Sequence, residues 1–93
     1  MLSPMIKEVS HYVNIDTESL ISQGIRSFLT DKKKSILLER LNILLRYHVI
    51  SKEELERGIE AGIISEHPAW EDLITVENLE SEAERIDGYL GNL

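Results

Sequence analysis

The sequence contains no cysteine, and aromatic residues make up only 5% of its 93 positions. Without cysteine, neither a disulfide nor a thiolate metal site can stabilise the chain. With so few aromatic residues, we expect a core made of aliphatic side chains. A chain of this length buries only about 60–65% of its unfolded surface. Because such a core is marginal by itself, oligomerisation is a common way to stabilise it.

Long apolar runs are also absent. The longest uninterrupted aliphatic runs are residues 36–38 and 43–45. A membrane-spanning helix needs about 20 apolar residues, and a signal peptide needs an apolar run of about 7–15. The formal net charge of −7 disfavours binding to anionic membranes or to nucleic acid in bulk. We therefore expect a cytoplasmic protein without membrane contact.

Charge is distributed unevenly along the chain. Residues 1–50 carry seven Lys/Arg against five Asp/Glu, a net charge of +2, whereas residues 51–93 carry three against twelve, a net charge of −9. A helical core with an acidic C-terminal arm suits a protein that binds a more basic protein. The lysines at 32–34 form a basic cluster, which is either a solvated corner or a contact for the acidic arm or for phosphate.

Apolar residues recur at helical spacing, and no strand pattern stands out. Ser3 and Pro4 predict the start of a first helix, and residues 14–17 predict a break before the second. Thr30 and Asp31 predict the start of a third helix, whose apolar residues cover most of its surface. Such a helix is buried on more than one side, and in so short a chain we expect another copy to supply the second covering surface.

The fourth predicted helix has the clearest end signals. Residues 51–54 form a capping box, and Ile50 with Leu55 forms the matching hydrophobic staple. Gly62 is placed to end this helix in the left-handed conformation. Pro68 then predicts the start of a last helical stretch. Its narrow apolar seam, which includes Leu79, is typical of a helix that packs on one partner surface.

The expected fold is therefore all-α: a small bundle of four to six helices that forms an intertwined or packed homodimer. Residues 1–65 are predicted to form the helical core and dimerisation region, and residues 66–93 an acidic helical arm that binds a partner. The predicted dimer interface consists of Ile25, Phe28, Leu37, Leu41, Leu44 and Leu45.

We find no pattern that predicts catalysis, a cofactor or a metal. The sequence has neither a Gly-rich phosphate loop nor a Ser that can be paired with a base. Glu8 and His11 have the Glu-x-x-His spacing of di-iron bundles, which need two copies of the motif. We interpret this single copy as a coincidence, unless a symmetric dimer supplies the second. Residues 37–61 have a helix-turn-helix outline, but the acidic second helix would be repelled by phosphates.

Trp70 is the most distinctive residue of the acidic half. It either anchors its segment on the chain's own core or is an anchor for a partner, since Trp is enriched at interface centres. In the second case the surrounding acids would steer a basic partner. The predicted partner-binding residues are Trp70, Glu71, Asp72, Leu73, Ile74, Leu79 and Glu80.

Two stretches resemble antitoxins of type II toxin–antitoxin systems. Residues 5–30 resemble the two helices of a ribbon-helix-helix dimeriser, and residues 66–74 are similar to a segment of small prokaryotic antitoxin-like proteins. The resemblance implies a homodimer that holds a basic, ribonuclease-type toxin inactive. The family reads DNA with a strand before its first helix. Here only residues 1–3 precede Pro4, and Asp16 and Glu18 would repel a phosphate, so DNA binding is doubtful.

The main functional hypothesis is thus an antitoxin-like module that is not an enzyme. Apolar side chains of the arm, among them Trp70 and Leu73, would insert into pockets of a basic partner. The alternative is a self-contained structural or scaffold oligomer, in which the arm folds back on the lysines at 32–34 and on the third helix. Trp70 would then belong to the core.

Overall fold

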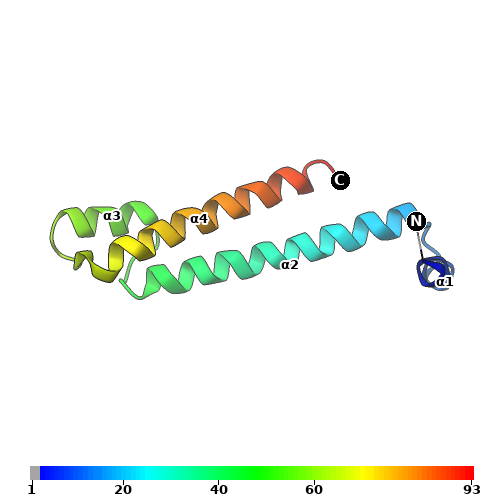
Figure 1. Ribbon diagram of the computed structural model, residues 1–93, viewed down its shortest axis with the longest axis horizontal. Coiled ribbons are helices and arrows are strands. Elements are labelled where there is room, and N and C mark those ends of the chain that lie inside the picture. Colours follow the sequence, from blue (N-terminus) through cyan, green and yellow to red (C-terminus); the bar gives the residue numbers. More distant parts are fainter. Residues whose placement is uncertain (1–2) are drawn as a thin grey trace.

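The computed structural model describes residues 3–93, which form four helices: α1 (Pro4–Val13), α2 (Thr17–Leu45), α3 (Lys52–Glu60) and α4 (Glu66–Leu90). The predicted all-α class is confirmed, since no strand occurs in this part of the chain. The long helices α2 and α4 form an antiparallel hairpin, with α3 beside α4 at one end and α1 at the other (Figure 1). Residues 1 and 2 of the predicted core region lie outside the described residues.

Local signals account for the ends of α1 and the start of α2. Ser3 occupies the N-cap position of α1 without a capping hydrogen bond from its side chain, Pro4 follows as the first helical residue, and Asn14 ends the helix with a positive φ of 58°. Asp16 caps α2, because its carboxylate accepts a hydrogen bond from the backbone N–H of Ser19 at 3.0 Å. Hydrogen bonds from the side chain and the backbone of Ser19 lower the pKa of Asp16. The predicted break between these helices is therefore confirmed.

The predicted start of a third helix at Thr30 and Asp31 is wrong, because α2 continues through both residues to Leu45. Thr and Asp are weak helix formers and cost only a few tenths of a kcal/mol up to about 0.7 kcal/mol each inside a helix. Leu29, Ile36 and Ile43 are spaced seven residues apart across this point, and all three pack in the core. Packing of this stripe against α4 outweighs the local capping preference.

The core lies between α2, α3 and α4, and its buried members are all aliphatic, as the shortage of aromatic residues predicts. Leu44 of α2, Leu55 of α3 and Val76 of α4 are fully buried. The predicted seam of α4 packs on the chain's own α2. The buried side chains are Ile36, Ile43, Leu44, Leu55, Ile59, Ala69, Leu73, Val76, Leu79, Ala83 and Ile86.

The predicted capping of α3 is largely confirmed. The backbone N–H of Glu54 donates to Ser51 Oγ at 3.2 Å, and Glu54 Oε2 accepts from the backbone N–H of Ile50 at 2.9 Å, one residue earlier than in the standard box. Ile50 is exposed, so the predicted staple with the buried Leu55 covers little surface. Gly62 adopts the predicted left-handed conformation with φ of 74°.

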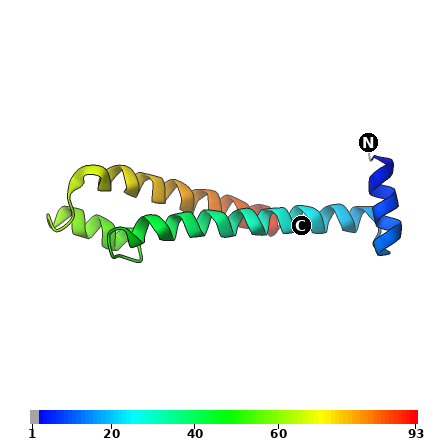
Figure 2. The ribbon, with the colours of Figure 1, turned by 90° about the horizontal axis from the view of Figure 1, so that it is seen from below.

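The molecule is elongated, with extents of 61 × 21 × 19 Å and a radius of gyration of 19.5 Å. A compact domain of this length would have a radius of gyration of about 12 Å. Helix α1 lies across the end of α2, away from the core (Figure 2), and none of its residues is buried. None of the helices in residues 3–93 is long and apolar enough to span a membrane.

Candidate functional site

Carboxylates of α4 pair with basic side chains of α2 along the hairpin. Arg40 Nε donates to Glu80 Oε2 at 2.5 Å, and Lys33 Nζ lies 2.6 Å from Asp87 Oδ1. These groups remain partly exposed, and pairs of this kind contribute about 0–1 kcal/mol each. Part of the negative charge of the C-terminal half is therefore neutralised by basic residues of the N-terminal half of the same chain.

Asp72 is held at the closed end of the hairpin by two residues of the α2 C-terminus. The Tyr47 hydroxyl donates a hydrogen bond to Asp72 Oδ2, and Arg46 Nη1 lies 3.7 Å from the same oxygen. Burial, followed by the hydrogen bond and the charge of Asp72, raises the pKa of Tyr47 to about 12. Asp72 thus joins α2 to the first turns of α4.

The predicted partner-binding residues occupy different environments. Leu73 and Leu79 lie in the chain's own core, where they are only 4% and 7% exposed, so in this arrangement they are not available to a partner. Asp72 and Glu80 are engaged by bases of α2. Their burial and pairing could not be read from the sequence, because the same seam could pack on a partner or on α2.

Trp70, Glu71 and Ile74 remain on the surface, and we call them the Trp70 surface. Trp70 is 36% exposed and Ile74 is 56% exposed. Their spacing of four places both side chains on the same side of α4. Glu71 lies beside them, and its pKa is lowered first by a hydrogen bond from its own backbone N–H and then by His67. His67 Nδ1 is 3.1 Å from Glu71 Oε1.

A second group of acids lies on α3, which packs beside α4. Glu53, Glu56 and Glu60 are exposed, and their spacing of three and four places them in one stripe along the helix. Together with the Trp70 surface, this stripe makes the end of the molecule formed by α3 and the first turns of α4 strongly acidic. We refer to it as the acidic end.

The predicted dimer residues also separate into groups. Leu44 is fully buried in the chain's own core, while the other five are exposed. Leu37, Leu41 and Leu45 recur every four residues and form one stripe of α2. Ile25 lies one turn before Leu29 on the side of α2 that faces α4, whereas Phe28, next to Leu29 in the sequence, lies about 100° away round the helix.

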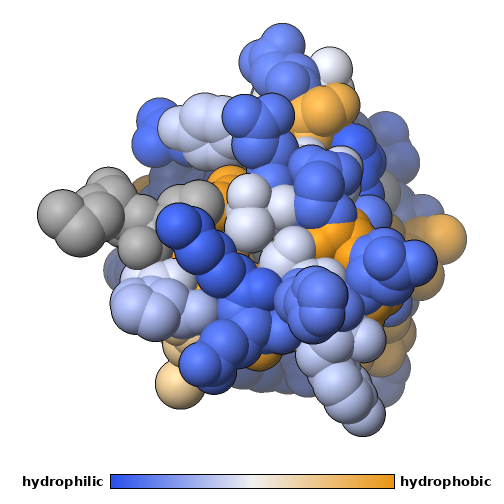
Figure 3. All heavy atoms as spheres, turned by 90° about the vertical axis from the view of Figure 1, so that its right-hand side faces the viewer, coloured by the Kyte–Doolittle hydropathy of each residue, from blue (hydrophilic) through white to orange (hydrophobic). Residues whose placement is uncertain are grey.

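Exposed apolar residues of α1 were not among the predicted interface residues. Met5, Val9, Tyr12 and Val13 are exposed, and in the view from this end of the molecule orange apolar side chains appear among hydrophilic ones (Figure 3). The amphipathic spacing of α1 is visible in the sequence. The sequence does not show that α1 buries none of its residues within the chain.

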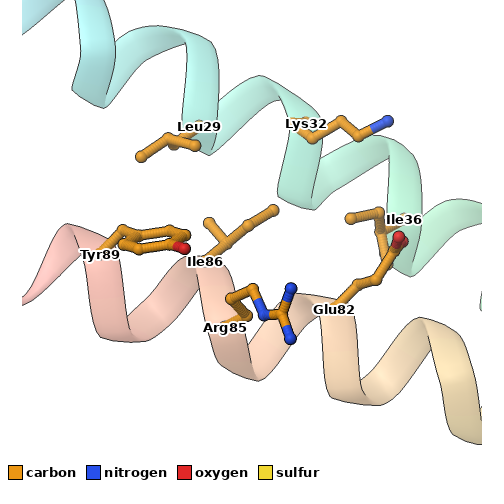
Figure 4. A pocket seen from close by; sticks show the side chains of 7 residues that line it. All are labelled: Leu29, Lys32, Ile36, Glu82, Arg85, Ile86 and Tyr89. Atoms are coloured by element: carbon orange, nitrogen blue, oxygen red, sulfur yellow. The ribbon is translucent and has the colours of Figure 1, made fainter.

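A shallow groove of about 200 Å³ lies between α2 and α4. Leu29 and Ile36 from α2 face Ile86 from α4, with Tyr89 closing one end (Figure 4). The charged side chains at the groove are Lys32, Glu82 and Arg85. The groove continues the apolar packing of the hairpin and presents no nucleophile paired with a base. Within residues 3–93, no group of three or more His, Asp or Glu is placed to hold a metal ion.

The geometry defines an all-α protein built on one antiparallel hairpin. The chain belongs to the uncharacterized protein MJ0235 family, which it matches over residues 1–93. One relative, uncharacterized protein MJ0235 of Methanocaldococcus jannaschii, is 33% identical over 69 residues, which span 74% of this chain and 84% of the relative. No solved structure matches the chain.

Proposed function

We propose that this protein is a non-enzymatic protein-binding module of the antitoxin-like class. In this proposal it is a cytoplasmic homodimer that binds a basic, ribonuclease-type protein through its acidic end. The observation that carries the proposal is the exposure of Trp70 and Ile74, one turn apart on an acidic helix. Large apolar side chains of this kind, ringed by charge, are typical of interface anchors.

Charge supports a basic partner. The acids of α3 and Glu71 would raise the rate of association with a positively charged protein and orient it. Leu73 and Leu79 stay in the core, so the partner would contact the Trp70 surface and the α3 stripe rather than the whole arm. Asp72 and Glu80 could contact the partner only if their ion pairs with Arg46 and Arg40 were replaced by ion pairs with basic residues of the partner.

A second candidate is a structural or scaffold oligomer that needs no basic partner. The packing of α4 along α2, with Lys33 paired to Asp87, favours this alternative. The two candidates differ in the role of Trp70, which is a partner anchor in the first and only a peripheral packing residue in the second.

The proposal is tested by capture from an extract of the source cells, followed by washes at low and then high salt. We expect a small basic protein that stays bound at low salt and is released at high salt, because salt screens exposed charge pairs. Trp70→Ala should weaken the purified complex by about thirtyfold or more, the loss of a typical anchor.

Tyr89→Ala is the matched control, because Tyr89 is also an exposed aromatic residue of α4 but lies at the end of that helix remote from the acidic end. It should leave the affinity unchanged. Recovery of the protein alone, or a change below about twofold for Trp70→Ala, would favour the scaffold oligomer instead.

A further inference from the structure

Helix α3 lies beside the first turns of α4 at the acidic end, and the two run in opposite directions (Figure 1). An ion pair fixes their alignment, because Lys52 Nζ at the start of α3 lies 3.6 Å from Glu77 Oε2 of α4. Both helices rise about 1.5 Å per residue, so counting in opposite directions from this pair brings Glu56 level with Leu73. The α3 stripe is therefore level with the Trp70 surface along the helix axes.

The same ion pair shows which stripes of the two helices share a side. Trp70 and Ile74 precede Glu77 on α4 at helical spacings of four and three, so all three lie on one stripe. Glu56 follows Lys52 on α3 at a spacing of four. Because Lys52 is paired with Glu77, the stripe that includes Trp70 and the stripe that includes Glu56 border each other.

The apolar part of the Trp70 surface thus has carboxylates on both sides. Glu56 and Glu60 are exposed on α3, and Glu71 lies about 100° round α4 from Trp70, on the side away from α3. Among residues 3–93, neither Glu56 nor Glu60 forms an ion pair. Both carboxylates are therefore available to basic groups of a partner that covers Trp70 and Ile74.

Negative charge is concentrated at this end of the molecule. Residues 52–77 carry two Lys/Arg and eight Asp/Glu, a net charge of −6, whereas the remainder of the chain carries only −1. A surface with an apolar centre and acidic borders is complementary to one with an apolar centre and basic borders, because like charges placed opposite each other repel. The occupant that fits is therefore both amphipathic and basic.

The recognition modes that the fold permits indicate what kind of segment this occupant is. An extended segment binds by adding a strand to a sheet edge, and residues 3–93 contain no strand. A polyproline segment needs a groove lined with aromatic residues, and Trp70 is the one aromatic residue of the sequence from 52 to 77. A helix instead presents an apolar stripe, and Trp70 and Ile74 offer it an apolar surface one turn long.

We propose that the partner binds the acidic end through one amphipathic, basic α-helix. Its apolar stripe covers Trp70 and Ile74, and its Lys and Arg side chains face the α3 stripe on one side and Glu71 on the other. This inference rests on the proposed function, and it names the form of the partner segment that the acidic end binds. Trp70 to Glu77 spans about 10 Å, so a partner helix of about three to four turns covers the surface.

The test uses the full chain and three synthetic peptides of about 14 residues, or about four turns. The first is an amphipathic helix of leucines spaced by three and four with lysines around them. The second has the same composition in an order without an apolar stripe, and the third has glutamate in place of each lysine. None contains tryptophan, so the fluorescence of Trp70, the single Trp of the chain, reports binding.

We expect the first peptide to move the Trp70 emission to shorter wavelength, because it removes water from the indole, and to gain helicity by circular dichroism. Its dissociation constant should be at least about tenfold lower than that of the second peptide. The third peptide should not bind, since its charge has the same sign as the acidic end.

A pair of charge variants tests the alignment of α3 with α4. Glu56→Gln combined with Glu60→Gln should weaken binding of the first peptide at least about fivefold. The matched control, Glu8→Gln combined with Glu39→Gln, removes the same charge from exposed positions of α1 and α2 outside the acidic end. At physiological salt, which screens distant charges, the control should bind within about twofold of the wild type.

Three results would overturn the helical partner segment. Equal affinity for the first two peptides would show attraction by charge alone, and absence of binding at about 1 mM would leave the surface without a helix. A shift of the Trp70 emission that grows with protein concentration, without any peptide, would assign the surface to a second copy. If the cell extract still yields a basic protein that Trp70→Ala releases, the proposed function stands in all three cases. An extract that yields no such protein would overturn both.

Discussion

At the scale of single residues, Tyr47 connects several features of the molecule. Its ring packs against the core, and its hydroxyl donates to Asp72 at the start of α4. Burial and the neighbouring carboxylate both disfavour the phenolate, which raises the pKa of Tyr47 to about 12 from its ordinary value of 10.0. The protonated form is therefore the one that stabilises the fold.

The raised pKa predicts a loss of stability in base. The folded-state pKa lies above the unfolded value, so the contribution of Tyr47 is complete below pH 10 and is lost as pH rises towards about 12. In urea unfolding measured across this range, the wild type should lose stability more steeply than Tyr47→Phe. Tyr89→Phe, altered at an exposed tyrosine, is the control and should follow the wild type. Parallel curves for wild type and Tyr47→Phe would contradict the assignment.

At the scale of elements, the connection from α3 to α4 depends on a close approach at Gly58. A Cβ added at Gly58 would lie 2.5 Å from Ile64 Cδ1 and 3.0 Å from Ile64 Cγ1. Ile64 in turn packs against the core, and its backbone N–H donates to the Gly58 carbonyl at 3.0 Å. The Ile64 side chain therefore fills the space that a side chain at residue 58 would need, and it would have to shift to admit one.

This contact predicts opposite effects for two glycine substitutions. Gly58→Ala should destabilise the protein by about 1 kcal/mol, because the overpacking at Ile64 exceeds the gain in helix propensity. Gly88→Ala in α4, where an added Cβ meets nothing within 4 Å, should be neutral or stabilising by up to about 1 kcal/mol. Chemical denaturation gives both values. Ile64→Val should partly rescue Gly58→Ala, and simple additivity of the two changes would count against the proposed clash.

The continuity of α2 is also decided at this scale. Thr30 and Asp31 have the local character of a helix start, and the sequence alone predicts one there. The core stripe through Leu29 and Ile36 keeps its helical phase across the two residues, which requires an unbroken helix. A local capping preference of about 1 kcal/mol cannot compete with the burial of several aliphatic side chains.

At the scale of the whole molecule, one small core joins α2, α3 and α4, while much of α1 and α2 stays exposed. Neighbouring leucines show the division: Leu44 is completely buried and Leu45 is 50% exposed. Both were predicted at a dimer interface, because the sequence pattern of α2 is apolar on more than one side. Which leucine belongs to the core depends on where α3 and α4 pack.

Substituting these two leucines tests the single core. Leu44→Ala should destabilise the chain by about 2–5 kcal/mol, the cost of a cavity in a packed core. This is a large part of the total stability of a small domain, about 5–15 kcal/mol, so its melting temperature should fall steeply. Leu45→Ala should change stability by less than about 0.5–1 kcal/mol. Thermal denaturation of both variants gives the two changes in stability. Equal losses of stability would place Leu45 in a buried interface as well.

The amino-acid sequence by itself determined the helical class, the aliphatic character of the core, the start of α1 at Pro4 and the cap of α3. These properties depend on composition and on residues within one turn of each other, such as Ser51 and Glu54. Only the tertiary structure decided that α2 is unbroken, that Leu73 and Leu79 are buried against the chain's own helices, and that α1 buries none of its residues. Those outcomes depend on which helix lies against which stripe, because burial is a property of pairs of elements distant in the sequence.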